Sequence, residues 1–148
     1  MATTDFDSLA VHTADGFTVN GVIVPTLFPV FFSVPAGAAA ADYDCVQVLT
    51  QAAQLVAVNE RHQTAGSDGS AVTLMLKKVP SGTAKASGTD TLSAGFNLKA
   101  VADTNQAGAL HATVANYQFA AGDGVALVST GTLTAVDGVG VTAWFKRI

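Results

Sequence analysis

The stretch Ala71-Val72-Thr73-Leu74-Met75-Leu76-Lys77-Lys78-Val79 decides the class of fold, because aliphatic side chains recur at every second position along it. Successive side chains of a β-strand point to opposite faces, so Val72, Leu74 and Leu76 would share one face. The other face would carry the intervening residues Thr73, Met75 and Lys77. This alternation predicts a strand with one face buried in a core.

A second strand with the same alternation is predicted at the end of the chain, over Val139–Lys146. Its apolar face would be formed by Val139, Val141, Ala143 and Phe145. Trp144 would then lie on the opposite face, together with Thr142. Two Asp-Gly pairs, Asp68-Gly69 and Asp137-Gly138, predict tight hairpin turns, because these residues tolerate the positive φ angles that such turns require.

Several other short segments are rich in β-branched and aromatic residues and are bounded by Gly, Asp or Pro. The further strands expected are Phe17–Val24, Phe28–Val34, Leu55–Arg61, Phe96–Ala100, Leu110–Val114, Val125–Val128 and Thr132–Val136. Pro29 cannot donate a ladder hydrogen bond, so Phe28–Val34 should lie at the edge of a sheet or outside it. Roughly eight to ten short strands with long middle connections predict an antiparallel β-sandwich, jelly-roll-like in topology. One domain is expected over residues 16–148, preceded by an extended N-terminal arm over residues 1–15.

The composition excludes several classes of partner. The net charge is −4 and the only adjacent basic pairs are Lys77–Lys78 and Lys146–Arg147, which are too few to follow a phosphate backbone, so nucleic-acid binding is not expected. No apolar run reaches the roughly 18–20 residues of a membrane span. The acidic N-terminus does not resemble a signal peptide, and the single Cys45 fits a protein made in a reducing cytoplasm. Charged residues make up only 12% of the chain, which favours assembly with other subunits.

No catalytic machinery is recognisable. None of the histidines, His12, His62 and His111, stands at the spacing of a metal-ligand set, and no nucleophile elbow or phosphate-binding loop occurs. Glu60 and His62 would share a face of a predicted strand and could form half of a metal site or an acid–base pair. The plainer interpretation is a polar strand end that emerges from the core. We therefore expect no enzyme activity, no metal and no cofactor.

The aromatic residues offer two further possibilities. Phe28, Phe31 and Phe32 form a cluster between prolines, which could anchor a partner or pack in the core. A carbohydrate site usually needs an amphipathic aromatic ring, and the candidates are Trp144, Tyr43 and Tyr117.

The order of motifs over residues 50–148 resembles that of a known family. The strand that begins at Ala71 ends in lysines and runs into a loop with the sequence Pro80-Ser81-Gly82-Thr83-Ala84. The remaining motifs are His62–Gly69, Gly88–Leu92, Phe119–Leu127, Thr130–Thr134 and the closing strand that starts at Val139 and ends in Lys146-Arg147. In this order they resemble the head decoration, cement and head-fibre proteins of tailed bacteriophages.

The resemblance implies a β-sandwich that binds the outer surface of the capsid as a homotrimer, at three-fold or quasi-three-fold positions. The partner would be the major capsid protein, and the protein would be made in the host cytoplasm and end up on the exterior of the virion. Contacts are expected from Thr3–Val11 of the arm and from the segment bounded by prolines, Pro25–Pro35. The candidate contact residues are Thr3, Phe6, Leu9, Val11, Phe28, Phe31 and Phe32. The alternatives are a head fibre or other module that binds carbohydrate on the host surface, and a structural component of the tail.

Overall fold

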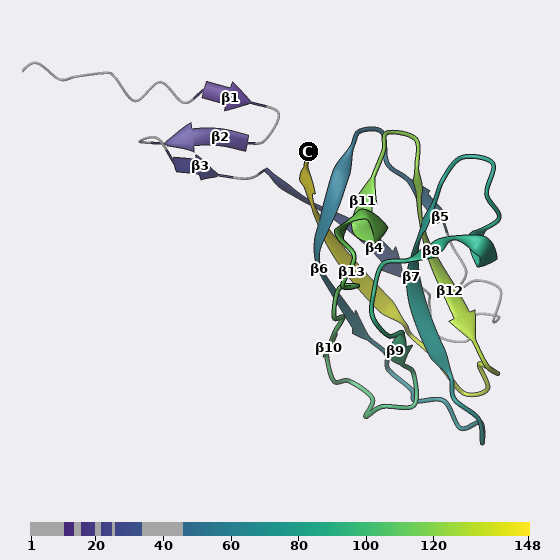
Figure 1. Cartoon of the computed structure of the whole chain (residues 1–148). Coiled ribbons are helices and arrows are strands. Elements are labelled where there is room, and N and C mark those ends of the chain that lie inside the picture. Colours follow the sequence, from purple (N-terminus) through teal and green to yellow (C-terminus); the bar gives the residue numbers. More distant parts are fainter. Residues whose placement is uncertain (1–10, 14–15, 20–21, 25, 34–45) are drawn as a thin grey trace, which may run out of the picture.

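A computed structural model describes residues 11–13, 16–19, 22–24, 26–33 and 46–148, with side chains from residue 26 onward. In this part of the chain the regular elements are strands, apart from two short 3₁₀ helices, η2 (Lys85–Ser87) and η3 (Val114–Tyr117). The strands form antiparallel sheets that pack as a sandwich (Figure 1). The prediction of an all-β sandwich is therefore confirmed, whereas the jelly-roll topology stays a prediction.

Two sheets make up the sandwich. The first has the order β10-β6-β13-β4, with β11 also paired to β6: β10 (Gln106–Ala107), β6 (Ala53–Arg61), β13 (Gly140–Arg147), β4 (Leu27–Ser33) and β11 (Gln118–Phe119). The second has the order β5-β12-β7-β8, with β9 also paired to β7: β5 (Val46–Val48), β12 (Gly124–Thr130), β7 (Thr73–Val79), β8 (Thr89–Asp90) and β9 (Phe96–Asn97).

A small third sheet precedes the sandwich. Its strands are β1 (Val11–Thr13), β2 (Gly16–Val19) and β3 (Val22–Val24), and none of them pairs with a strand of the other two sheets (Figure 1). The single strand predicted over Phe17–Val24 is therefore wrong, since β2 and β3 pair antiparallel as two strands. β1 falls within the predicted arm and pairs with β2.

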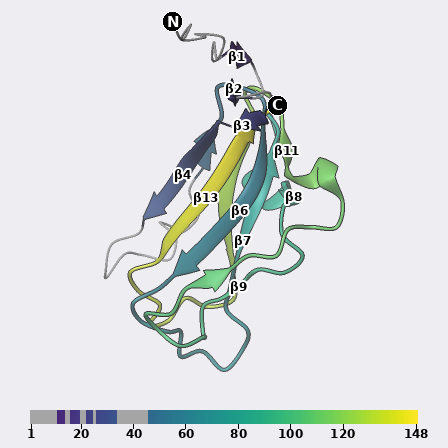
Figure 2. The same cartoon turned by 90° about the vertical axis from the view of Figure 1, so that its left-hand side faces the viewer.

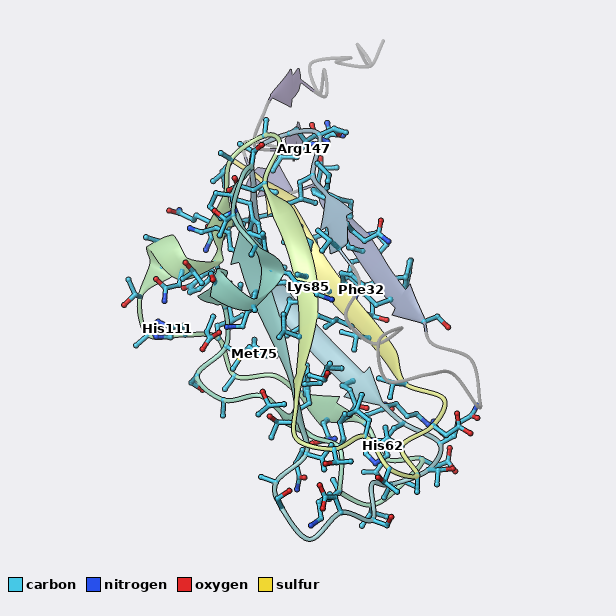
Figure 3. The ribbon with its side chains drawn as sticks, turned by 90° about the vertical axis from the view of Figure 1, so that its right-hand side faces the viewer. Phe32, His62, Met75, Lys85, His111 and Arg147 are labelled. Carbon is cyan, nitrogen blue, oxygen red and sulfur yellow. The ribbon has the colours of Figure 1, made fainter. Side chains whose placement is uncertain are left out.

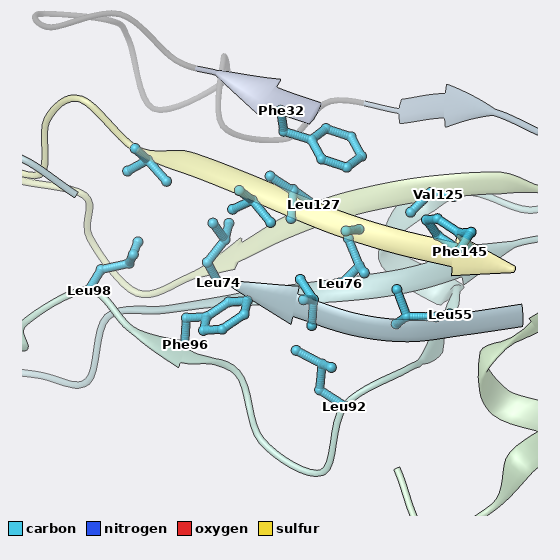
Figure 4. Packing of buried hydrophobic residues seen from close by; sticks show 14 of the residues in the cluster. Phe32, Leu55, Leu74, Leu76, Leu92, Phe96, Leu98, Val125, Leu127 and Phe145 are labelled. Atoms are coloured by element: carbon cyan, nitrogen blue, oxygen red, sulfur yellow. The ribbon is translucent and has the colours of Figure 1, made fainter. Parts of the chain in front are cut away.

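The core forms where the inward faces of β7, β12, β6 and β13 meet (Figure 4). Val72, Leu74 and Leu76 are fully buried, as the alternation of this stretch predicts. On β13 the predicted apolar face is also buried, and Phe145 stands between two other rings. Its centroid lies 5.7 Å from that of Phe28, in a stacked pair, and 5.4 Å from that of Phe119, edge to face. Burying each large side chain stabilises the fold by about 1.5–3 kcal/mol.

The proline-containing segment lies at a sheet edge, as predicted. β4 is the last strand of the first sheet, and among the described strands only β13 pairs with it. Figure 2 shows β4, β13 and β6 side by side, with β4 outermost. Pro29 fits here because an edge strand needs only one of its two rows of hydrogen bonds.

Both predicted Asp-Gly hairpins are wrong. β6 and β7 belong to different sheets, so the segment with Asp68-Gly69 crosses between the sheets instead of reversing within one. Gly69 does not adopt a positive φ, and Asp68 accepts a hydrogen bond of 2.9 Å from the Ser70 hydroxyl. Gly138 has the predicted positive φ of 60°, but the residues before it form a turn instead of the strand Thr132–Val136, and Asp137 makes an isolated bridge to Thr64.

The strand predicted over Leu110–Val114 is also wrong. β10 and β11 pair with two separate parts of β6, and the chain between them leaves the sheet edge. Leu110 makes a single bridge to Leu92, and Val114 begins the helix η3 with its side chain exposed. Five alternating residues can form a strand only where a neighbouring edge is available, and here the chain has left it. Phe96–Ala100 is likewise shorter than predicted, because β9 ends at Asn97.

Candidate functional site

The outer face of the first sheet carries an exposed tryptophan. Trp144 is 37% exposed, whereas its neighbours Ala143 and Phe145 are fully buried, because alternate residues of β13 point to opposite faces. The register places Pro29 of β4 and Ala57 of β6 on either side of Trp144. Both flanking side chains are short, so the indole stands above its neighbours on this face.

Polar side chains surround one side of this indole. Thr142 is the next outward-pointing residue from Trp144 along β13. On β6, Asn59 lies opposite Thr142 in the strand register. A hollow of about 370 Å³ opens to solvent here, and we call it the Trp144 groove. Its lining residues are Asn59, Glu60, Arg61, Asn105, Gly140, Thr142 and Trp144.

A glycine opens the floor of the groove. Gly140 pairs with Arg61 on β6 and with Ser33 on β4, so its missing side chain would point outward between them. A Cβ atom built on Gly140 would approach a single heavy atom within 4 Å, the carbonyl oxygen of Arg61 at 3.9 Å. The absence of a side chain at this outward position thus leaves space in the groove.

An ion pair fixes one wall. The Arg61 guanidinium donates a hydrogen bond of 3.1 Å to Asp103 Oδ1. Asp103 is itself held by its backbone, since its N–H donates to the carbonyl oxygen of His62 at 2.8 Å and its φ is 57°. Because both side chains are more than half exposed, the pair adds little stability. Its effect is to neutralise the charge that Arg61 brings to the groove.

A buried polar network lies beneath this wall, on the inward face of β6. Glu60 is 1% exposed and His62 is fully buried, and His62 Nδ1 lies 3.0 Å from Glu60 Oε1. The Gln106 amide donates to Glu60 Oε2 at 2.6 Å and to the Asn97 carbonyl at 2.9 Å, and its oxygen accepts a hydrogen bond of 3.2 Å from the Asn97 N–H. The network holds β10 against β6 and thereby positions Asn105, the neighbour of Gln106 in the groove.

The hydrogen bonds determine how many protons the pair holds. His62 Nε2 donates to the carbonyl oxygen of Ala100 at 3.1 Å, because that oxygen can only accept. A single proton therefore remains for the contact between His62 Nδ1 and Glu60 Oε1. Burial raises the pKa of Glu60, and the hydrogen bond and charge of His62 and the Gln106 amide counteract only part of that rise.

The sequence prediction for this pair is confirmed in one respect and wrong in another. Glu60 and His62 do share a face. That face points into the sandwich, so the pair is enclosed and is not a strand end that emerges from the core. Figure 3 places His62 at the opposite end of the sandwich from Arg147. Among the described residues, no group of three or more His, Cys, Asp or Glu side chains could hold a metal ion.

The predicted contact residues fall into three groups. Thr3, Phe6 and Leu9 lie outside the described residues, and Val11 lies in β1, where only the backbone is described. Phe32 is buried at 3% exposure, and Phe28 is half-buried against Phe145. Phe31 is 63% exposed on the outer face.

The remaining aromatic and histidine candidates also differ in burial and in whether their side chains are described. Tyr117 is half-buried against the core, and Tyr43 lies outside the described residues. His12 lies in β1, where only the backbone is described. His111 is half-buried and accepts a hydrogen bond of 3.0 Å from the Thr113 N–H. Of these candidates, Trp144 is the one that combines exposure with a polar surround.

Sequence reasoning placed Trp144 and Thr142 on one face but missed Asn59, Arg61, Asn105 and Gly140. Asn59 and Arg61 alternate with the buried side chains of the predicted strand Leu55–Arg61, so their outward direction could have been inferred. Asn105 carries no such signal, because its place depends on a long connection that returns to β6.

Comparisons with known proteins identify no relative. No family model matches the chain, and neither curated proteins nor solved structures give a significant match. Within the described residues, no helix is long and apolar enough to cross a membrane. The case for a function therefore rests on the surfaces of the molecule and on the sequence motifs.

Proposed function

We propose that the protein is a structural component of a tailed-phage virion that binds the outer surface of the expanded capsid as a decoration or cement protein. The order of motifs over residues 50–148 supports this role, and so does the all-β sandwich. The structural observation that carries the proposal is the apolar edge of the first sheet, formed by β4.

β4 presents two features that a docking edge needs. No described strand pairs with its outer side, so within the described residues its backbone groups there are left for strand addition by a partner. Its outward side chains include Leu27 and Phe31, which are 51% and 63% exposed. Soluble proteins usually carry charged side chains on such an edge, which prevent it from pairing with another chain. Between Leu27 and Ser33 there is no charged residue.

The second sheet ends in a similar edge. β5 is its outermost strand, and Val46 and Val48 on it are 44% and 65% exposed. A standard interface buries about 800 Å² on each partner, and apolar edges of this kind favour such burial. If three copies act together on one capsid position, avidity would raise the apparent affinity roughly 10²–10⁴-fold.

Sedimentation with capsid shells tests the proposal. The purified protein is mixed with emptied, expanded shells of its phage or with unexpanded procapsids, and the pelleted protein is quantified. We expect saturable binding to expanded shells only, in multiples of three per capsomer junction. Binding to neither shell would overturn the proposal, and rings or tubes formed by the protein alone would support a tail component instead.

Matched substitutions test the role of the β4 edge. Phe31→Lys adds a charge to that edge and should strongly reduce binding to shells. Val101→Lys is the control, since Val101 is 77% exposed in the connection between β9 and β10. Deletion of residues 1–14 should also abolish binding if the arm contributes the contacts that the resemblance implies. Equal binding by Phe31→Lys and Val101→Lys would show that β4 is not the docking edge.

A further inference from the structure

We infer that the Trp144 groove is a binding site for a neutral carbohydrate. This inference goes beyond capsid decoration and does not depend on it, because the residues that line the groove come from β6, β13 and Asn105, and β4 only borders it. The hollow of about 370 Å³ falls within the range of roughly 300–1,000 Å³ that small-ligand sites occupy. Its open shape suits one or two residues of a chain that continues along the surface.

The groove combines the two kinds of contact that sugars require. The indole of Trp144 offers an apolar ring face against which the C–H groups of a pyranose can stack. The amides of Asn59 and Asn105 each provide donors and an acceptor, and Thr142 provides a hydroxyl. Within the described part of the chain, none of these three side chains is hydrogen bonded to another residue. They are therefore free to bond the hydroxyl groups of a ligand.

The charge of the groove argues for a neutral ligand. Arg61 is its only basic residue, and Asp103 neutralises it at 3.1 Å. Glu60 contributes to the lining but its side chain is buried on the other face of the sheet. An anionic polymer such as a nucleic acid or a sulfated glycan would need several unpaired cations and would meet a protein of net charge −4.

The supporting structure keeps the site in place without a ligand. Three side chains of the groove lie on two adjacent strands that pair with each other, Asn59 on β6 and Thr142 and Trp144 on β13. Asn105 is held through its neighbour Gln106, which is hydrogen bonded to the buried Glu60. A preformed site loses less conformational entropy on binding, which favours recognition of flexible sugars.

The first experiment uses intrinsic fluorescence, because Trp144 is the only tryptophan in the chain. The full-length protein is first screened on an array of neutral and acidic glycans. It is then titrated with linear hexasaccharides of glucose, mannose, galactose and N-acetylglucosamine. Dextran sulfate is the anionic probe. We expect a saturable shift of the emission with at least one neutral probe. Absence of a shift with every neutral probe, or binding of dextran sulfate alone, would overturn the inference.

Substitutions then locate the binding. Gly140→Val places a branched side chain on the floor of the groove, where its Cβ atom has open space. It should abolish the shift, because the new side chain occupies the space of the ligand. Asn59→Ala should weaken binding about tenfold, as expected for the loss of one well-placed hydrogen bond. Trp144→Ala, measured by calorimetry, should lose binding, and Val114→Ala is the exposed control outside the groove. Unchanged affinity in Gly140→Val would show that the sugar binds elsewhere and would overturn the inference.

The two proposals fail separately. Leu27→Lys, at the end of β4 that pairs with Lys146, should lose shell binding and retain the fluorescence response. Gly140→Val should lose the response and still pellet with shells. If no neutral probe binds and Gly140→Val or Trp144→Ala abolishes shell binding, the groove is part of the capsid contact and the carbohydrate inference is wrong.

Discussion

His62 and Glu60 are hydrogen bonded to each other in the interior of the sandwich, with 3.0 Å between His62 Nδ1 and Glu60 Oε1 and neither side chain accessible to solvent. Such a pair is costly to break, because the remaining partner would be left buried without its hydrogen bond. It links three separate parts of the chain, since Gln106 and the carbonyl oxygen of Ala100 complete its hydrogen bonds.

Removing the carboxyl group should destabilise the fold. We expect Glu60→Ala to lower the free energy of unfolding by about 2–4 kcal/mol, because it removes the partner of His62 Nδ1 and one acceptor of the Gln106 amide in the interior. Glu60→Gln should cost less than about 1 kcal/mol, since its amide can donate to His62 Nδ1 and its oxygen can accept from Gln106. Denaturant unfolding of both variants measures the difference. Equal losses would contradict the proton arrangement.

The same pair should make stability depend on pH. The pKa of Glu60 is raised by burial, so above pH 4.5, the ordinary pKa of this group, the folded protein holds a proton that the unfolded chain releases. The stability that this proton contributes is complete below pH 4.5 and is lost as the pH rises through the raised pKa. The wild-type protein should therefore lose stability relative to Glu60→Gln as the pH rises above 4.5.

Paired unfolding curves at each pH measure this difference, in which the titrating groups that do not contact Glu60 cancel. A difference that stays constant, or that grows in favour of the wild-type protein as the pH rises, would contradict the raised pKa.

Two glycines should respond oppositely to alanine. Gly131 has a φ of 88°, and a Cβ atom there would collide with the backbone oxygen of Ala71, so Gly131→Ala should lower the unfolding free energy by more than about 1 kcal/mol. Gly69 has an ordinary φ and open space around it, so Gly69→Ala should be neutral or should stabilise by about 0.4–1 kcal/mol. Thermal unfolding of the two variants provides the comparison. Strong destabilisation by Gly69→Ala would indicate a positive φ at Gly69, as the hairpin predicted from the sequence requires.

The aromatic cluster of the core should be far more sensitive than the exposed ring. Phe145→Ala removes a fully buried side chain that contacts Phe28 and Phe119, and should cost about 3–5 kcal/mol. Phe31→Ala, at a position 63% exposed, should change stability by less than about 0.5 kcal/mol. Chemical denaturation separates the two cases. Comparable losses would mean that Phe31 is covered in the folded protein.

The sequence predicted the strands that bury a full face and missed the connections between them. β7 and β13 follow from strict alternation, and β4 was placed at an edge from its proline, Pro29. The hairpin prediction at Asp68-Gly69 was wrong because the same dipeptide suits both a hairpin and a bend in a segment that crosses between sheets. Which of the two forms depends on the sheet that the next strand joins.

By itself the sequence determined which side chains of β7 and β13 point inward and which point outward, because a period of two is a property of each strand alone. It thus placed Trp144 and Thr142 together on one face. Only the tertiary structure decided their lateral neighbours, bringing Asn59 beside Thr142 and joining Gln106 to Glu60 across 46 residues. Strand order results from burying both sheets against each other, which is a property of the whole chain and leaves no mark at a single position.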